Sequence, residues 1–281
     1  MKCTSLTSIE INDSVTSIGA YAFWNCTGLE SVVLPESVTN VEEYAFRNCT
    51  SLAGATYDNA IYLGDENNPY VFLLNALNTS ITSCKINENT KIVGSFAFRS
   101  CTSLMSVEIP NSVISIGYSA FQSCNSLASV TIPDSVKSIG YYLFQSCENL
   151  TNVTISDDIT SIGHGMFYYC TSLESITIPD SVIIIGDSAF QHTKLKSINI
   201  PDRVTSIGEG AFNSCENLES VVIPGSVTSI DLGAFRYCTS LTSITFEGTM
   251  TQWNEITFGS KWNGDVPATT VTCSDGTVTL S

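Results

Sequence analysis

The chain has 281 residues, of which 43% are hydrophobic and only 14% charged, a composition that supports a large buried core and excludes a disordered protein. Its 27 acidic residues against 11 basic ones give a net charge of −16. This charge disfavours binding to nucleic acid, whose phosphates it repels, and docking on anionic lipid. Because no run of about 18 apolar residues is present, the sequence predicts no membrane insertion.

The N-terminal segment contains no basic stretch followed by an apolar one, so it predicts no signal peptide. A repeat begins there at once, with Cys3 standing one period before Cys26. Native solenoids need a polar cap over the first repeat. We therefore expect further sequence upstream, where a secretion signal could lie.

Phenylalanines recur along the chain at a nearly fixed step of 23 residues, interrupted by one step of 52 and one of 22. They are Phe23, Phe46, Phe98, Phe121, Phe144, Phe167, Phe190, Phe212 and Phe235. A period between about 20 and 50 residues is typical of stacked supersecondary units. We therefore predict a β-rich repeat solenoid.

One copy of the repeat shows how each unit is built. Leu104 is followed by Val107 and Ile109, which alternate with polar residues as in a short strand with one buried face. Pro110 has no N–H for continued pairing and ends that strand. A second apolar pair and Gly117 come next. One copy buries too little to fold alone, so stacking must pair the strands in parallel ladders.

The position of Gly117 is occupied by Glu42 and Asp231 in two other copies. The turn at this position therefore does not strictly demand a positive φ angle.

Residues 101–121 match almost throughout the pattern Cys-x-x-Leu-x-x-Ile-x-Ile-Pro-x-Ser-Val-x-x-Ile-Gly-x-x-Ala-Phe. This pattern resembles the BspA-like leucine-rich repeats, which bacterial surface proteins and some protozoan proteins carry. The resemblance covers essentially the whole chain. It implies a leucine-rich repeat right-handed superhelix of 23-residue units with short strands and short helical turns. It also implies adhesion or host interaction, but it does not identify a ligand.

The domain organisation that we predict is a repeat array over 1–245 and a C-terminal cap over 246–281, with a hairpin insertion at about 53–82. Within the insertion, the turn composition of 64–69 separates two apolar runs. We expect a β-hairpin that leaves the regular outline.

Insertions in repeat arrays often lie on the binding face. Tyr62, Asp65, Glu66 and Tyr70 are therefore candidate binding residues. The alternative is a hairpin that only covers a lateral surface.

The repeat pattern ends after Phe235. Trp253 and Trp262 follow, and Asp275-Gly276 signals a two-residue hairpin turn. We interpret this region as an aromatic cap over the last coil. The alternative is a sugar-binding site with exposed tryptophans.

Nine of the eleven cysteines occupy one column of the repeat: Cys3, Cys26, Cys49, Cys101, Cys124, Cys147, Cys170, Cys215 and Cys238. No Cys-x-x-Cys pair is present, so zinc-ligand spacing is absent. Parallel side chains in a ladder fit disulfide geometry badly, and Thr193 stands in the same column. We predict free, buried thiols, with no metal site and no cofactor.

A second column, just after the strand-ending position, is mostly acidic: Asp13, Glu36, Glu88, Asp134, Asp157, Asp180 and Asp202. It could bind Ca²⁺ weakly or recognise a basic partner. The alternative, which we favour, is a solvated turn column where Asp suits the backbone.

Aromatic side chains gather near the Ala-Phe positions, whereas the strand face carries mainly small polar residues. We take Tyr118, Tyr141, Tyr142, Tyr168 and Tyr169 as further candidate binding residues. Tyr118, Tyr141 and His164 share one column. Packing between adjacent loops is the alternative role.

The sequence contains no recognisable nucleophile motif or nucleotide-binding fingerprint, and its two histidines lie in different repeats. We predict no catalytic residues. The favoured function is a monomeric, non-enzymatic protein, secreted or at the cell surface, that binds a host or matrix protein or a glycan. The alternatives are an architectural spacer of a larger secreted protein and a calcium-dependent lectin or hydrolase.

Overall fold

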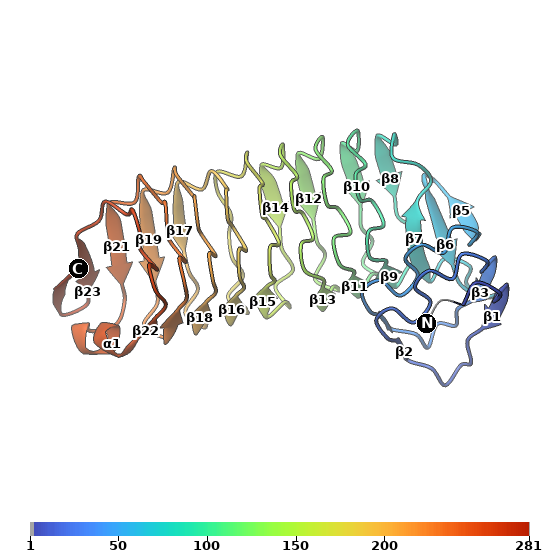
Figure 1. The fold of residues 1–281 in the computed structure, drawn as a ribbon, viewed down its shortest axis with the longest axis horizontal. Coiled ribbons are helices and arrows are strands. Elements are labelled where there is room, and N and C mark those ends of the chain that lie inside the picture. Colours follow the sequence, from blue (N-terminus) through green and yellow to red (C-terminus); the bar gives the residue numbers. More distant parts are fainter. Residues whose placement is uncertain (1–2, 281) are drawn as a thin grey trace. The chain divides into compact units, whose positions relative to one another are not determined.

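In the computed structural model, which describes residues 3–280, the chain divides into two compact units, Met1–Leu143 and Phe144–Ser281. Each unit is a stack of coils built from short strands and turns (Figure 1). The fold is thus a β-solenoid, as the 23-residue period predicts, and its short strands and turns agree with what the resemblance to leucine-rich repeats implies.

The first unit, which we call unit 1, contains thirteen strands. They are β1 (Ser8–Glu10), β2 (Ser17–Ile18), β3 (Ser31–Val33), β4 (Asn40–Val41), β5 (Ala55–Tyr57), β6 (Ala60–Leu63), β7 (Phe72–Ala76), β8 (Ser83–Lys85), β9 (Ile92–Val93), β10 (Ser106–Glu108), β11 (Ser115–Ile116), β12 (Ser129–Thr131) and β13 (Ser138–Ile139).

The second unit, unit 2, contains the remaining strands and one helix. They are β14 (Asn152–Thr154), β15 (Ser161–Ile162), β16 (Ile184–Ile185), β17 (Ser197–Asn199), β18 (Ser206–Ile207), β19 (Ser220–Ile223), β20 (Ser229–Ile230), β21 (Ser243–Phe246), α1 (Met250–Glu255), β22 (Thr257–Phe258), β23 (Thr270–Cys273) and β24 (Gly276–Thr279).

A regular coil carries two strands, and each pairs in parallel with the strand one repeat away. In unit 1, β1 pairs with β3 and β11 with β13. In unit 2, β17 pairs with β19 and β18 with β20. The middle residue of a three-residue strand faces the core, while its neighbours are exposed, as in β12 and β17. This alternation is what the Leu-x-x-Val-x-Ile spacing predicts.

The Ala-Phe segment forms a run of hydrogen-bonded turns on the third side of each coil. The N–H groups of Ala97, Arg99 and Cys101 each donate to the carbonyl three residues earlier. Positive φ angles at Phe96 (64°) and Ser100 (59°) stop this run from continuing as an α-helix. Equivalent pairs of positive φ angles flank the phenylalanines of most other coils. Within residues 3–280, α1 is the only α-helix.

The phenylalanine rings stack directly on one another inside each unit. The ring centroids of Phe98 and Phe121 lie 5.2 Å apart, with an interplanar angle of 2°. In unit 2, the rings of Phe190, Phe212 and Phe235 stack in the same way. The backbone holds this spacing, because the N–H of most of these phenylalanines donates to the carbonyl of the residue that precedes the phenylalanine of the next coil, as from Phe212 to Ala234 at 2.7 Å.

Glycine occupies its column in most coils because the backbones of neighbouring coils come close together there. A Cβ on Gly117 would lie 2.5 Å from the backbone nitrogen of Ser95, and one on Gly140 would lie 2.3 Å from that of Tyr118. Neither glycine has a positive φ. The glycine therefore provides space rather than a left-handed backbone, in agreement with the sequence interpretation.

The insertion contains the predicted β-hairpin, formed by β6 and β7 with the turn at 64–69 between them, but this hairpin extends the sheet that contains β9 instead of leaving it. Strands β5, β6 and β7 pair antiparallel, and β7 then pairs in parallel with β9 (Figure 1). The apolar residues of β6 and β7 need burial, and only the core of the stack provides it. For the same reason the Tyr62 side chain is fully buried, which rules it out as a surface binding residue.

The C-terminal region extends both ladders before it ends. Strand β21 pairs with β19, and β22 pairs with β20. Helix α1 then places Trp253 against Phe246, Phe258 and Trp262, with ring centroids 5.2–5.8 Å apart. Strands β23 and β24 form an antiparallel hairpin. Both tryptophans are buried, so the geometry matches an aromatic lid and not an exposed sugar site.

Candidate functional site

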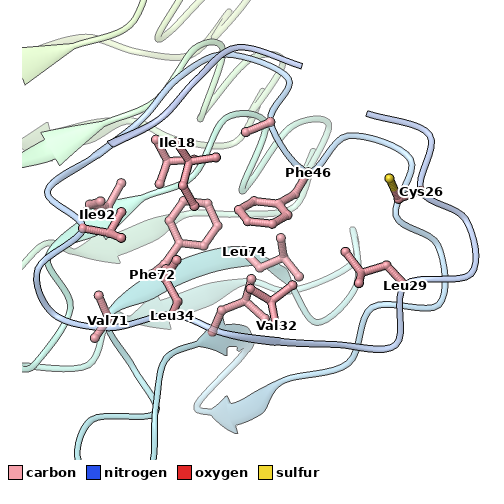
Figure 2. Close-up of a cluster of buried hydrophobic side chains, with 14 residues drawn as sticks. Ile18, Cys26, Leu29, Val32, Leu34, Phe46, Val71, Phe72, Leu74 and Ile92 are labelled. Atoms are coloured by element: carbon pink, nitrogen blue, oxygen red, sulfur yellow. The ribbon is translucent and has the colours of Figure 1, made fainter. Parts of the chain in front are cut away.

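One coil of unit 1 lacks the Ala-Phe turn that its neighbours have. Strand β7 takes the place of a two-residue strand, but the chain then continues straight, and the N–H of Ala76 donates to the carbonyl of Ala97 at 2.6 Å. Figure 2 shows Phe72 beside Phe46, and their ring centroids lie 5.7 Å apart. Phe72 therefore covers the apolar end of the phenylalanine stack without forming a turn.

The missing turn leaves an open pocket of about 370 Å³ between the turns at 42–50 and 95–99. Its apolar wall comes from Phe46, Phe72 and Leu74, and polar groups of Asn48 and Asn75 also line it. A volume of this order matches small-molecule sites in proteins, which combine an apolar lining with a few polar groups. We call it the insertion pocket.

Two arginines stand at the insertion pocket, although the whole chain has only four. The Arg47 guanidinium lies over the rings of Tyr44 and Phe96, 5.0 and 4.7 Å from their centroids, and that of Arg99 lies 5.4 Å from Phe96. Among the described residues, neither guanidinium has a carboxylate within salt-bridge distance or a hydrogen-bond acceptor. Stacking occupies the planar face of a guanidinium, so its in-plane N–H donors remain available to a ligand.

The rings beside the pocket form a continuous series that we call the aromatic row: Tyr21, Tyr44, Phe96, Tyr118 and Tyr142. Adjacent members contact each other at centroid distances of 5.0–5.7 Å. Tyr44 joins the two sides of the pocket, since it touches both Phe96 and Tyr118. Burial, followed by a hydrogen bond with Tyr118, raises the pKa of Tyr44 to about 12, so this phenol stays neutral at physiological pH.

One carboxylate also lines the pocket. The Oε2 atom of Glu42 accepts a hydrogen bond from the N–H of Ala20 at 2.9 Å, which directs this group to the neighbouring turn. The pocket therefore carries two cationic side chains against one engaged carboxylate.

The tip of the insertion is separate from the pocket lining. Asp65 Oδ1 accepts hydrogen bonds from the N–H groups of Asn67 and Asn68 at 2.8 Å and so stabilises the turn. Tyr70 packs edge-on against Tyr62, with centroids 5.6 Å apart. Of the four candidate residues in the insertion, only Glu66 is exposed. The tip residues that we selected from the sequence thus have mainly structural contacts, apart from Glu66.

A comparison with protein families identifies the repeat. The profile of the BspA type leucine-rich repeat region matches residues 1–67, 69–182 and 160–263. The chain belongs to the BspA-type leucine-rich repeat family.

Solved leucine-rich repeat structures resemble this BspA-type chain. A leucine rich cell surface protein from Faecalibacterium prausnitzii is 29% identical over 90% of this chain and 82% of that one, with a TM-score of 0.42. The leucine-rich repeat protein of T. pallidum is 25% identical over 67% of this chain and 77% of that one, with a TM-score of 0.48. A leucine-rich repeat protein from Bacteroides ovatus is 22% identical over 92% of this chain and 73% of that one, with a TM-score of 0.44. Among curated proteins, no relative matches.

The described part of the BspA-type chain contains no helix that is long and apolar enough to cross a membrane.

Unit 2 of the BspA-type array holds the other predicted tyrosines. Tyr168 and Tyr169 pack edge-on at 4.8 Å, and His192 lies 4.2 Å from the ring of Tyr169. Burial lowers the pKa of His192. His164 Nδ1 lies 3.6 Å from Asp187 Oδ2. These rings contact each other without forming a pocket like that of unit 1 in the described residues.

In unit 1, the structure brings together Tyr118 and Tyr142, whereas Tyr141 is exposed by 57%. Tyr118 and Tyr142 are members of the aromatic row, and Tyr141 remains on the surface beside it.

The cysteine column consists of free thiols, most of them buried; Cys3 is exposed and Cys49 partly so. A column thiol donates to the phenylalanine carbonyl of the preceding coil, as from Cys124 to Phe98 at 3.1 Å and from Cys238 to Phe212 at 3.1 Å. Thr193, in the same column, donates its hydroxyl to the carbonyl of Phe190 in its own coil at 2.9 Å. This hydrogen bond explains why a small side chain with a donor occupies the column.

The acidic column gives no cation site in the described residues, which contain no group of three His, Cys, Asp or Glu side chains that could hold a metal ion. Glu36 instead accepts a hydrogen bond from the Asn68 side chain at 2.7 Å.

The two pocket arginines were missed in the sequence. Arg47 and Arg99 each follow a column phenylalanine directly, a position filled by Trp, Gln, Tyr or Asn in most other copies. The signal that could have revealed them is that an arginine stands at this position on each side of the 52-residue step.

Proposed function

We propose that the chain is a non-enzymatic protein, acting as a monomer at the cell surface or after secretion, that binds a protein or glycan of a host or surrounding matrix. The observation that carries this proposal is the aromatic row of unit 1 together with the two unpaired arginines of the insertion pocket. Membership of a leucine-rich repeat family supports a binding role, because such folds typically present surfaces rather than catalytic centres.

The physical basis is a rigid, preformed surface. Hydrogen bonds between coils fix the turns that carry the row, including those from Phe96 to Tyr118 at 2.9 Å and from Tyr21 to Glu43 at 3.2 Å. Binding then costs little ordering of the protein. Tyrosine and arginine are also the residue types that dominate binding energy at interfaces.

The test uses a pull-down with extracellular-matrix proteins and a glycan array. The variant Tyr21→Asn/Tyr142→Asn removes both ends of the row, and asparagine tolerates the positive φ angles of 59° and 57° at these positions. Tyr237→Asn is the matched control, since Tyr237 also has a positive φ (62°) but lies in unit 2.

We expect the wild type and the control to bind a common ligand, and the double variant to lose at least about tenfold in affinity. Equal affinity of all three proteins for the ligand would show that the aromatic row does not take part in binding. A complete lack of binding in both assays would favour the architectural spacer instead.

A further inference from the structure

We infer that the insertion pocket binds a carboxylate-bearing sugar residue of an acidic glycan. This inference rests on the proposed function and specifies its ligand class. The first support is charge: the pocket concentrates Arg47 and Arg99 in a chain whose net charge is −16. Although acidic side chains outnumber basic ones in this chain, these two guanidinium groups have no carboxylate partner among the described residues.

The two arginines are held ready for a planar anion. The Arg47 guanidinium lies over the rings of both Tyr44 and Phe96, at 5.0 and 4.7 Å from their centroids. A guanidinium presents two parallel N–H donors that match the two oxygens of a carboxylate. Because the rings already fix Arg47, a carboxylate ligand gains these bonds with little loss of side-chain freedom.

The rest of the lining fits a ring that carries hydroxyl groups. Phe72 and Leu74 offer an apolar surface for the C–H face of a sugar, and Thr50 and Asn75 offer a hydroxyl and an amide group for its hydroxyls. A short acidic peptide side chain would pair with an arginine but would leave these polar groups without partners. The lining therefore favours an acidic sugar over an acidic peptide.

The overall charge selects against dense polyanions. A nucleic-acid backbone carries closely spaced phosphates, which a surface of net charge −16 repels. An acidic glycan carries at most about one carboxylate per ring, and a single pocket of about 370 Å³ can receive one such ring while neutral rings lie outside.

The probe is a sugar trimer in which one galacturonic acid residue is joined to two neutral galactose rings, and its methyl ester is the matched ligand without charge. Binding is measured by titration calorimetry on the whole chain. Three variants are compared with the wild type: Arg47→Gln, Arg99→Gln and, as a control, Arg203→Gln. Arg203 is exposed, lies in unit 2 and is not among the residues that line the pocket.

We expect the acidic trimer to bind the wild type and the control equally, and each pocket variant to lose roughly tenfold or more. The methyl ester should bind at least about tenfold more weakly than the acid, and added salt should weaken only the acid. Phe96→Asn, which keeps a residue that tolerates the φ of 64°, should also weaken binding because Arg47 loses a stacking partner. Thermal denaturation of each variant checks that the fold is retained.

Three results would overturn the inference. Equal binding of acid and ester would show a neutral-sugar site and leave the proposed function intact. Binding of a matrix protein without any binding of the trimer would assign the surface to a protein partner. Tighter binding of a glutamate-rich peptide than of the trimer, lost in Arg47→Gln, would replace the sugar by an acidic peptide. If neither the pull-down, nor the glycan array, nor the trimer shows binding, both the proposed function and the inference fail.

Discussion

The Sγ atom of Cys170 lies 3.2 Å from the carbonyl oxygen of Phe144, one coil earlier in unit 2. This contact connects the two most regular columns of the repeat, because the thiol of one column donates to the backbone of the other. The thiol is completely enclosed, so its donor has no access to water.

The first prediction concerns this donor. We expect Cys170→Thr to change the free energy of unfolding by less than about 1 kcal/mol, because a hydroxyl in this column finds a backbone acceptor, as that of Thr193 does with the Phe190 carbonyl of its own coil at 2.9 Å. Cys170→Val, similar in size but without a donor, should cost about 1 kcal/mol more. Urea denaturation measures both. If the Cys170→Val variant were as stable as the Cys170→Thr variant, the thiol would serve only to fill space.

The second prediction concerns thiol accessibility. In native protein, N-ethylmaleimide should modify Cys3 rapidly and Cys49 slowly, because these are the exposed and the partly exposed thiol. The other nine cysteines are buried and should react only after unfolding. Mass spectrometry of the labelled protein counts the adducts. Rapid modification of more than two thiols in the native state would contradict the packed ladder.

The third prediction concerns stability at alkaline pH. Burial raises the pKa of Cys101 and Cys215 to about 11 and that of Cys84 to about 12, from an ordinary value of 9.0. Above pH 9 the unfolded chain releases these protons while the folded chain keeps them, so unfolding becomes more favourable. Their stabilisation is therefore complete below pH 9 and is lost between pH 9 and about 12.

The loss should approach about 1.4 kcal/mol per pH unit for each such thiol. Urea denaturation at a series of pH values measures this slope. Cys101→Thr should flatten it, because threonine does not titrate in this range. A slope that is the same in both proteins would show that the Cys101 thiol does not contribute.

The fourth prediction compares two glycines of the same column. A Cβ at Gly117 would lie 2.5 Å from the backbone nitrogen of Ser95, whereas one at Gly19 would meet nothing within 4 Å. Gly117→Ala should therefore destabilise unit 1 by about 1–3 kcal/mol. Gly19→Ala should be neutral or should stabilise by about 0.4–1 kcal/mol, because alanine restricts the unfolded chain. Thermal unfolding of both variants checks the sign, and equal effects would show that coil contact does not select glycine.

The periodic part of the fold could be predicted from the sequence, because each column repeats one physical requirement. Phe98 and Phe121 stack since they stand 23 residues apart in identical coils. The same reasoning predicted free thiols and a C-terminal hairpin at Asp275-Gly276, which β23 and β24 form.

The aperiodic part could not be predicted in the same way. The register of β7 against β9 pairs Phe72 with Ile92, and no column relates these residues in the sequence. Tyr62 was misplaced for this reason, because its burial depends on β6 lying beside β7. Arg47 and Arg99 likewise meet at one pocket only because the intervening coil makes no turn.

That coil has a consequence for stoichiometry. A stack of identical coils has translational symmetry, so a ligand that fits one coil would fit several others equally well and could slide among them. The coil with β7 breaks this symmetry, because it makes no Ala-Phe turn and Phe72 of its strand packs against Phe46. A ligand that binds at this irregular coil has only one site. Each protein molecule should therefore bind one ligand molecule in one fixed orientation.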